Sequence, residues 1–395
     1  MGDALSLLEA RLQTVVDSEY STVFNSDGRV LAKAVTAPRS HPPYANSAVD
    51  GYVFFGGLSK GAHCFELRDG RSAAGEAFAG VVESGQALRI FTGAALPQGT
   101  DTVVLQEDVL VEGSKLYVNG PLERGANARS SGEDVVQGTV LFAAGHRIQP
   151  QDIGLLISVG VAQVKVFKAL RVAVISTGTE LCAPGTEARL DQVFDANRPM
   201  LRAILQRWGM QIVDMGIVPD DASLVRQALD EAAQQADVIL TSGGASSGDE
   251  DHMSAILSET GNMSLWRIAI KPGRPLALGM WSGVPVFGLP GNPVAAFVCT
   301  LVFARPALMQ LSGSGFARPQ LLSLPANFNK NKKAGRREYL RARLRNGEVE
   351  AFASEGSGRV SGLSWADGLV ELPDEAVQVT AGQIVRFFPY SSFGL

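Results

Sequence analysis

The segment that decides the fold runs Ala236-Asp237-Val238-Ile239-Leu240-Thr241-Ser242-Gly243-Gly244-Ala245-Ser246-Ser247-Gly248-Asp249-Glu250-Asp251. Its apolar first part predicts a buried strand, and its second part is a run of small residues, hydroxyls and three acids. Glycine N–H groups and Ser or Thr hydroxyls can converge on phosphate oxygens. Carboxylates repel phosphate, but Mg²⁺ takes both as ligands. The segment therefore predicts an anion site beside a metal ion, and a loop of turn-forming residues is the alternative.

Strand and helix patterns alternate on both sides of this segment. The predicted strands are 171–176, 211–218, 237–241, 266–270 and 285–289, and the predicted helices are 198–208, 222–235, 251–259 and one that starts at Pro293. This alternation predicts an α/β domain with a mostly parallel sheet that is covered by helices on both faces. Ligands bind such sheets at the carboxyl ends of the strands. We therefore expect the polar residues that follow these strands to share one crevice.

The ends of these strands supply most of the candidate site residues. They are Ser176, Thr177, Gly178, Glu180, Asp220, Ser242, Gly243, Gly244, Ser246, Asp251, Pro290, Gly291, Asn292 and Pro293. Lys271 and Arg274 add two cations on a Pro-braced loop, which suits phosphate. A helix that starts at Asn292-Pro293 would point its positive end into the same crevice.

Each of these motifs also has an ordinary structural interpretation. Asp220-Asp221 could be an N-cap pair for the following helix. Glu180 could be a solvated loop acid, and Lys271 with Arg274 could form a basic surface loop. We keep these alternatives open at this point, because a capped helix and a binding site can coexist.

The rest of the chain has the pattern of β-rich parts. Strand-length runs at 81–83, 87–91, 102–105 and 115–118 predict a β module, and Leu5, Leu8, Leu12 and Val15 or Val16 predict an amphipathic first helix. The segment 135–168 combines a strand at 140–142, a helix at 150–159 and a strand at 162–167. After a linker at 312–319, short strands over 320–395 predict a small β barrel or sandwich.

Composition excludes several classes of protein. A length of 395 residues predicts two to four domains, and 46% hydrophobic with 19% charged residues is typical of a soluble globular protein. The net charge of −5 argues against a general polyanion binder, and we expect the basic run 330–337 to be a solvated hairpin rather than a nucleic-acid site.

The cysteines and the N-terminal sequence predict the cellular compartment of the protein. Cys64, Cys182 and Cys299 are far apart, which favours a reducing compartment. The N-terminus lacks a signal-peptide pattern, and we see no run of about twenty apolar residues. We therefore expect a cytoplasmic protein without a membrane span. Neither a P-loop nor a strand-associated G-x-G-x-x-G motif is present.

The motifs, taken in order and spacing, resemble the MoeA and gephyrin E-domain family, the molybdopterin molybdenumtransferases. The matching segments are Asn46-Ser47-Ala48-Val49-Asp50-Gly51-Tyr52, Phe91-Thr92-Gly93-Ala94, Gly132-Glu133-Asp134, Ser176-Thr177-Gly178-Thr179-Glu180-Leu181, Asp195-Ala196-Asn197-Arg198, Asp220-Asp221, Ser242-Gly243-Gly244, Lys271-Pro272-Gly273-Arg274-Pro275 and Gly288-Leu289-Pro290-Gly291-Asn292-Pro293. Thr179, Phe194 and Arg274 depart mildly from the commoner family pattern.

The resemblance implies a four-part architecture. It comprises a mixed domain from 1–41 plus 131–168, an inserted β domain at 42–130, a central α/β domain at 169–314 with a three-layer, mostly parallel sheet like that of MogA and MoaB proteins, and a C-terminal β-barrel-like domain at 315–395. It also implies an elongated homodimer whose active sites combine the central domain of one subunit with the β-rich part of its partner. Asp50 and Thr92 would then act in trans.

The resemblance also implies the reaction. Molybdate is inserted into adenylylated molybdopterin with Mg²⁺, and AMP and molybdenum cofactor are released. The implied catalytic residues are Asp50, Thr92, Asp134, Glu180, Asp220 and Asp251, with Glu180, Asp220 and Asp251 as metal ligands. Which of Asp249, Glu250 and Asp251 acts stays open, as does stable binding of the adenylyltransferase or of cofactor-accepting enzymes. The alternatives are a molybdopterin adenylyltransferase and a non-catalytic scaffold on the same fold.

Overall fold

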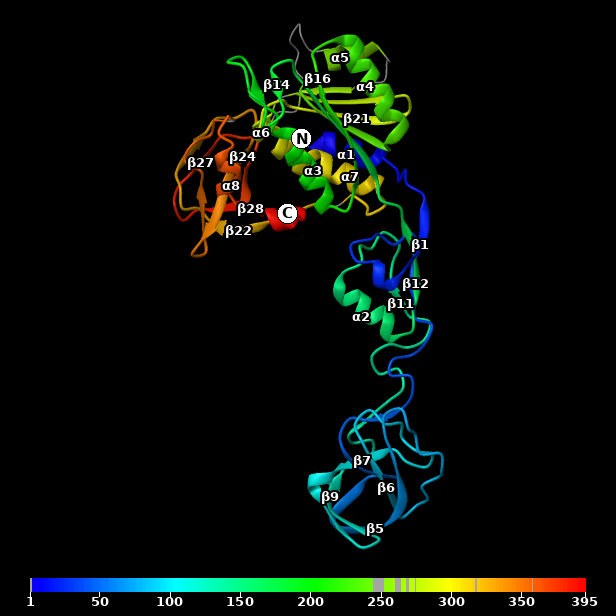
Figure 1. The fold of residues 1–395 in the computed structure, drawn as a ribbon. Helices are drawn as coiled ribbons and strands as arrows, with labels where there is room; N and C mark the ends of the chain where they lie inside the picture. Colours follow the sequence, from blue (N-terminus) through cyan, green and yellow to red (C-terminus); the bar gives the residue numbers. More distant parts are fainter. Residues whose placement is uncertain are drawn as a thin grey trace.

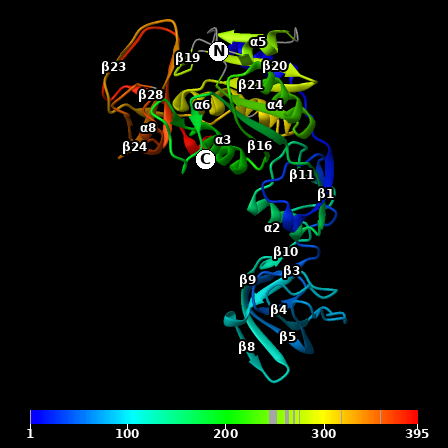
Figure 2. The same cartoon turned by 45° about the horizontal axis from the view of Figure 1, so that its top comes forward.

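The computed structural model describes residues 2–243, 252–259, 264–267, 270–273, 275–316, 318–356 and 358–395. The molecule is elongated and bent (Figure 1). A head contains the central and C-terminal elements, and a narrow arm extends from it and ends in a separate β domain. A view turned by 45° shows the same division (Figure 2).

The head is built on a six-stranded sheet with the order β16-β13-β17-β21-β20-β18. These strands are β16 (Gln211–Val218), β13 (Arg171–Thr177), β17 (Val238–Ser242), β21 (Val284–Leu289), β20 (Pro275–Trp281) and β18 (Ser264–Arg267). The first four strands are parallel neighbours, whereas β20 runs antiparallel to both β21 and β18. The mostly parallel α/β sheet that we expected is therefore present.

Helices cover both faces of this sheet, as predicted. Val172 and Val174 of β13 join one core cluster with α3 (Asn197–Arg207), whereas Ala173 and Ile175 join another with α4 (Ala222–Gln235) and α5 (His252–Glu259). Alternate side chains of a strand point to opposite faces. An apolar strand such as β13 is thus buried on both sides, which explains its unbroken hydrophobic pattern.

A long apolar helix completes the first of these clusters. It consists of α6 (Pro293–Cys299), a π-helical turn (Thr300–Ala304) and α7 (Arg305–Leu311). Within the described part of the chain, Pro293–Leu311 is the one helix long and apolar enough to cross a membrane, and 83% of its most apolar window is buried inside the protein. The stretch includes Thr300, Arg305 and Gln310, so it is not an unbroken apolar run, and its burial matches that of a core helix.

The arm holds two small domains in series. In the first, β1 (Ser18–Thr22) pairs with β12 (Gln163–Phe167) and β2 (Val35–Thr36) pairs with β11 (Val140–Phe142), beside α2 (Pro150–Ser158) and a 3-10 turn (Val23–Asn25). The chain leaves it through β3 (Asn46–Ser47) and returns through β10 (Ala128–Arg129), which are hydrogen-bonded to each other. The far β domain is therefore an insertion.

The inserted domain is a six-stranded sheet with the order β7-β4-β6-β5-β9-β8. Its strands are β4 (Gly51–Phe54), β5 (Leu58–Ser72), β6 (Gln86–Ile90), β7 (Thr102–Leu105), β8 (Val109–Glu112) and β9 (Lys115–Leu122), with a 3-10 turn at Gln106–Asp108. The prediction of a strand at 81–83 is wrong. Val81 makes one isolated bridge with Gln98, and Val82 is buried from a loop.

The C-terminal domain contains a sheet with the order β19-β24-β26-β28-β22, in which β25 pairs with β24. Its elements are β22 (Leu322–Pro325), β23 (Lys330–Lys332), β24 (Arg337–Arg345), β25 (Glu348–Ala351), α8 (Ser361–Trp365), β26 (Gly368–Leu372), β27 (Val377–Val379), β28 (Ile384–Pro389) and a 3-10 turn (Tyr390–Phe393). One strand of the sheet, β19 (Ile270–Lys271), lies between β18 and β20 in the sequence.

The basic run 330–337 does not form the solvated hairpin that we expected. β23 pairs with β27, whereas β24 pairs with β26. Lys332 is buried and donates to the carbonyl oxygens of Lys333 and Glu375, and Arg337 pairs with acids. Lys332 and Arg337 are thus buried or neutralised by residues distant in the sequence, whereas Lys333 is exposed.

The first helix, α1 (Gly2–Arg11), packs on the head rather than on the arm. Leu8 is buried in the same core cluster as α3 and α7, and Leu5, Leu12 and Val16 pack against that cluster. We had counted this helix with the mixed domain. The helix ends at Arg11, so Leu12 and Val16 make their contacts from the segment that follows it.

Candidate functional site

The strand ends that we singled out lie side by side at the carboxyl edge of the central sheet. Ser176 is in register with Ser242 of β17, and Ser242 is in register with Leu289 of β21. On the other side of β13, Thr177 faces Val218 of β16. The structure therefore brings the segments 176–180, 219–220, 242–243 and 290–293 to one edge.

Two glycines allow the walls of this edge to approach closely. A Cβ atom at Gly243, where φ is +99°, would lie 2.4 Å from the carbonyl oxygen of Thr177. A Cβ atom at Gly291 would lie 3.5 Å from the Cα atom of Gly243. Glycine at 243 is required by both its backbone conformation and the lack of space. The three segments thus pack closely together at this edge of the sheet, where we expected the ligand crevice.

Three buried polar atoms without partners lie at or next to these strand ends. Among the described residues, the hydroxyls of Thr177 and Thr241 and the Oδ1 atom of Asn197 are buried and have no hydrogen-bond partner. A buried polar group without a partner costs roughly 1–3 kcal/mol. Such groups are rare in folded proteins and call for an explanation. A polar ligand that accepts from the hydroxyls would supply one.

Two carboxylates stand at the rim where β13 and β16 end. A Cβ atom at Gly178 would lie 2.6 Å from the Glu180 carboxylate, so this side chain folds back over the end of β13. Asp220 accepts a hydrogen bond from the Thr179 backbone N–H at 2.9 Å, and its own N–H donates to the Thr179 hydroxyl at 3.1 Å. These bonds fix Asp220 beside the turn that carries Glu180.

The N-cap interpretation is correct for the neighbouring residue. The Asp221 side chain accepts from the backbone N–H groups of Ser223 and Leu224 at the start of α4. Asp220 does not cap the helix but bonds to Thr179. The two adjacent acids therefore have separate tasks.

Glu180 and Asp220 fit a hard cation chemically. Within the described part of the chain, neither forms an ion pair with Lys or Arg, and no group of three acidic, His or Cys side chains has metal-site geometry. Two carboxylates without a cation at one rim suit Mg²⁺ with substrate oxygens and water. Asp251, the third predicted ligand, lies outside the described residues with Asp249, Glu250, Gly244, Ser246 and Arg274.

The Pro290–Pro293 turn forms the opposite wall. The Asn292 side chain accepts from the N–H groups of Val294 and Ala295, and Pro293 takes the first helical position, as expected. Asn197 donates to the Gly291 carbonyl oxygen at 2.7 Å and to the Ser242 hydroxyl at 2.6 Å. One buried amide thus ties the β17 end to this wall.

Our candidate set missed several residues that hold the crevice together. Asp195 is buried, and it accepts from the Ser176 hydroxyl at 3.0 Å and from Arg198 at 3.0 Å. Arg198 also pairs with Asp214 on β16 at 2.8 Å. The segment Asp195-Ala196-Asn197-Arg198 belonged to the family match, and that match was the available signal. Nothing local in the sequence assigned it a role.

The remaining candidates lie on the arm. The Oδ1 atom of Asp50 accepts from the Thr92 backbone N–H at 2.8 Å and from the Thr92 hydroxyl at 2.7 Å. Arg89, which sequence reasoning missed, stacks on Tyr52 and Phe91 at 5.0 and 4.9 Å from the ring centroids. Tyr52 is its cross-strand partner, so the stack follows from strand register.

The Thr92 hydroxyl, more than any other group, holds the pKa of the Asp50 carboxyl below its usual range. We expect Thr92→Val to raise this pKa toward the usual value of about 3.9 and Thr92→Ser to leave it low. A lowered pKa adds stability that is complete above the unfolded-state pKa and is lost as the pH falls through the folded-state pKa. A carboxyl NMR titration of Asp50 in the three proteins measures the shift. Equal pKa values in wild type and Thr92→Val would contradict the assignment.

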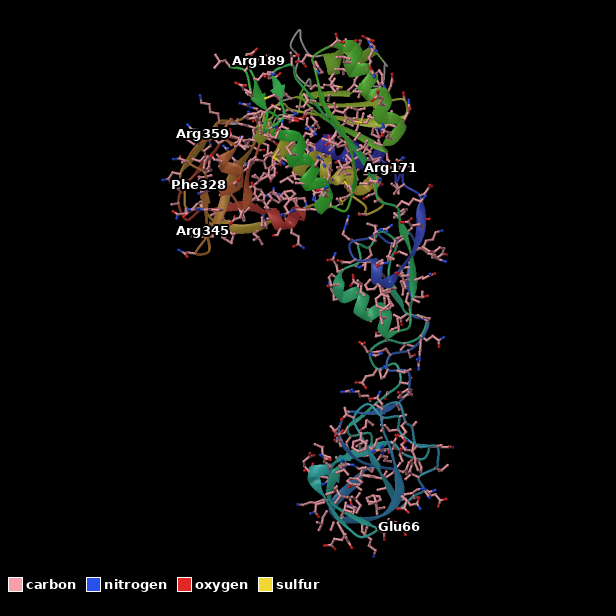
Figure 3. The ribbon with its side chains drawn as sticks, viewed as in Figure 1. Glu66, Arg171, Arg189, Phe328, Arg345 and Arg359 are labelled. Atoms are coloured by element: carbon pink, nitrogen blue, oxygen red, sulfur yellow. The ribbon has the colours of Figure 1, made fainter. Side chains whose placement is uncertain are left out.

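Within one chain the structure does not bring these residues to the crevice. Arg171, at the amino end of β13, lies where the arm leaves the head, whereas Arg189, beyond β14 (Leu181–Cys182), lies on the opposite side of the head (Figure 3). Glu66 marks the inserted domain at the far end of the arm. Asp134 is exposed, and its N–H donates to the His41 carbonyl oxygen between the two arm domains.

Comparison with family models divides the chain in a consistent way. The MoeA N-terminal region (domain I and II) matches residues 1–160, a probable molybdopterin binding domain matches 173–310, and the MoeA C-terminal region (domain IV) matches 323–390. The middle match coincides with the sheet whose carboxyl edge forms the crevice. These three matches place the chain in a class of multidomain proteins whose central part is the α/β domain matched at 173–310.

Curated relatives and solved structures extend the match to the whole chain. A molybdopterin molybdenumtransferase of Haemophilus influenzae is 33% identical, with 99% of this chain and 98% of that protein covered. Molybdopterin molybdenumtransferase 2 of Mycobacterium tuberculosis is 32% identical, with 90% and 91% covered. The crystal structure of the molybdopterin biosynthesis MoeA protein from Pyrococcus horikoshii OT3 has a TM-score of 0.87 at 27% identity, with 98% and 99% covered. The chain belongs to the molybdopterin molybdenumtransferase (MoeA) family.

Proposed function

We propose that this chain is the transferase of molybdenum cofactor biosynthesis that inserts molybdate into adenylylated molybdopterin and releases AMP in a Mg²⁺-dependent step. Family membership supports the pathway and the class of enzyme. The observation that carries the mechanism is the combination, at one sheet edge, of unpartnered buried hydroxyls with two carboxylates that lack a cation partner among the described residues. That combination suits an anionic substrate with a divalent cation.

In this mechanism the chain chiefly binds and orients the reactants. The hydroxyls of Thr177 and Thr241 and the backbone at Gly243 and Gly291 would hold the phosphate-bearing part of the substrate. Glu180, Asp220 and Asp251 would hold Mg²⁺, and the ion would supply positive charge that balances phosphate charge. Ser176, Ser242 and the wall formed by Pro290 to Pro293 would shape the crevice around them.

We further propose that the active unit is a homodimer. Asp50 and Thr92 match the family pattern but lie on the arm of the same chain, away from the crevice. Their pairing and the neighbouring Arg89 form a polar surface that can meet the crevice of a second copy. In this arrangement the arm of each subunit completes the site of the other.

Location and partners belong to the same proposal. We propose that the protein works in the cytoplasm, without binding membrane or nucleic acid, and receives its substrate from an adenylyltransferase before passing the cofactor to accepting enzymes. The net charge of −5 and the pairing of Arg337 with Glu371 and Asp374 support the absence of a nucleic-acid role.

The decisive test is AMP release from adenylylated molybdopterin by the purified protein, measured with Mg²⁺ and with molybdate present or absent. We expect release that needs both ions. Tungstate in place of molybdate measures oxyanion preference. Molybdopterin with ATP tests the adenylyltransferase alternative, and efficient adenylate formation there would overturn the proposal. A scaffold without activity would release no AMP under any condition.

A further inference from the structure

The C-terminal domain holds a loop of the candidate site. β19 lies in the sequence between strands of the central sheet, but it pairs in parallel with β24 of the C-terminal sheet. Ile270 is in register with Arg337, and Lys271 is in register with Glu338. The backbone directly before Pro272-Gly273 is therefore part of the C-terminal domain's sheet.

Four charges surround the end of this strand. The Lys271 ammonium lies 2.8 Å from a Glu355 carboxylate oxygen and 3.4 Å from one of Glu338. Lys330 pairs with the same two acids and lies 3.3 Å from Glu338. Two cations and two anions cancel, so Lys271 is not the free cation that its position in the sequence indicated.

The members of this cluster differ in exposure. The side chains of Lys330 and Glu338 are 13% and 11% exposed, whereas that of Glu355 is 43% exposed. Hydrogen bonds from Lys271 and then Lys330 hold the pKa of the Glu355 carboxyl below its usual range. Glu355 is therefore ionised at neutral pH, and it is the more exposed of the two acids.

The cluster is not itself a substrate pocket. The cavity beside Lys271, Glu338 and Glu355 has a volume of about 20 Å³, which is room for about one water molecule. An adenylylated pterin cannot enter this space. The effect of the cluster on the reaction must therefore pass through the loop that it holds.

That loop packs directly on the crevice wall. A Cβ atom at Gly273 would lie 2.9 Å from the Cys299 sulfur and 3.5 Å from the Pro290 side chain. Pro290 precedes Gly291, which lies against Gly243 and accepts from Asn197. A continuous path of contacts thus joins Lys271 to the anion crevice.

We propose that Glu355 of the C-terminal domain is a positioning residue, which holds Lys271 and thereby presses the Pro272-Gly273 segment against the Pro290 wall of the crevice. The inference rests on the proposed function. Glu355 does not contact the substrate, and it acts through Lys271. The C-terminal domain then sets the geometry in which the adenylate is cleaved.

The test compares Glu355→Gln with wild type in AMP release and in equilibrium binding of adenylylated molybdopterin without molybdate. The amide keeps the shape but leaves the cluster one positive charge in excess. We expect kcat to fall about tenfold, because Lys271 loses the closer of its two carboxylate partners, while the Kd stays the same or becomes tighter. Glu355→Asp keeps the charge, and we expect it to restore at least about half of the wild-type kcat.

The matched control is Glu350→Gln. Glu350 pairs with Arg343 at 2.7 Å in the same domain. Arg343 lies five residues beyond Glu338 on β24, past the part of that strand that pairs with Lys271. We expect wild-type kcat and Kd for this variant. If Glu355→Gln matches Glu350→Gln in both constants, or loses activity only in proportion to unfolded protein in a thermal melt, the inference is wrong. Absence of activity in the wild type would instead overturn the proposed function.

Discussion

Asp220→Asn is expected to abolish molybdate-dependent AMP release while the protein stays folded. The asparagine Oδ1 atom can still accept from the Thr179 N–H, which Asp220 does at 2.9 Å, so the turn keeps its geometry. What disappears is the negative charge at the rim, where we place Mg²⁺. Loss of a preorganised electrostatic contact of this kind lowers kcat on the order of 100-fold or more. Rates at saturating substrate, together with a circular dichroism melt, measure both effects.

The adjacent residue supplies the control for this prediction. Asp221 caps α4 by accepting from Ser223 and Leu224, and asparagine is an equally good N-cap residue. Asp221→Asn removes the same charge one residue away and should keep near-wild-type rate and stability. Equal activity of the two variants would show that Asp220 has no special part in the reaction. Glu180→Gln should behave as Asp220→Asn does.

Mixing two inactive variants is expected to restore activity. In the shared-site dimer, a chain with Asp50→Asn keeps an intact crevice, and a chain with Asp220→Asn keeps an intact arm. A mixed dimer therefore has one fully native site and one site with both changes. Random pairing makes half of the dimers mixed, so activity should recover to about a quarter of wild type. AMP release after subunit exchange between separately purified variants gives this number.

A second mixture tests whether recovery of activity comes from a site shared between subunits or from mixing alone. Asp50→Asn and Thr92→Val both change the arm, where the two side chains are joined by a 2.7 Å hydrogen bond. Each site of that mixed dimer carries one lesion, so no recovery is expected. If neither mixture recovers although mixed dimers are present, Asp50 and Asp220 do not meet across subunits.

Much of the central domain could be predicted because its signals are local. β13, β17 and β21 are short apolar runs between helices whose apolar residues recur at helical spacing. The strand ends then had to meet at one edge, because parallel strands share their carboxyl side. The main strand missed in this sheet was β20. It starts at Pro275 and runs antiparallel, so it interrupts the alternation on which the prediction relied.

The missed strand β5 shows a second limit. Most of its fifteen residues are exposed or half-buried, so it carries little apolar alternation. Its pairing with β6 and β9, rather than its own composition, makes it a strand. Strand propensity reflects packing against neighbours more than an intrinsic preference of the residue.

The sequence indicated which residues belong to the site, but it did not indicate which of their side chains pair with one another. Residues such as Thr177, Gly243 and Asn292 could be chosen because their chemistry follows a strand end. The pairing of Lys271 with Glu338 and Glu355 joins residues 67 and 84 positions apart, and no local pattern encodes it. The same holds for Asn197, whose amide bridges Ser242 and Gly291.

The entry and exit strands of the inserted domain, β3 and β10, have a consequence for how such proteins arise. Ser47 pairs with Ala128 and Asn46 pairs with Arg129, so the two ends of an eighty-residue module lie next to each other. A gene can gain or lose a module with adjoining ends while the host keeps its core. A short turn between positions 46 and 129 would close the host chain. The shortened protein would keep its crevice and lose the surface that carries Asp50. The inserted domain, with the residues that we place in the partner's site, can therefore be gained or lost independently of the rest of the fold.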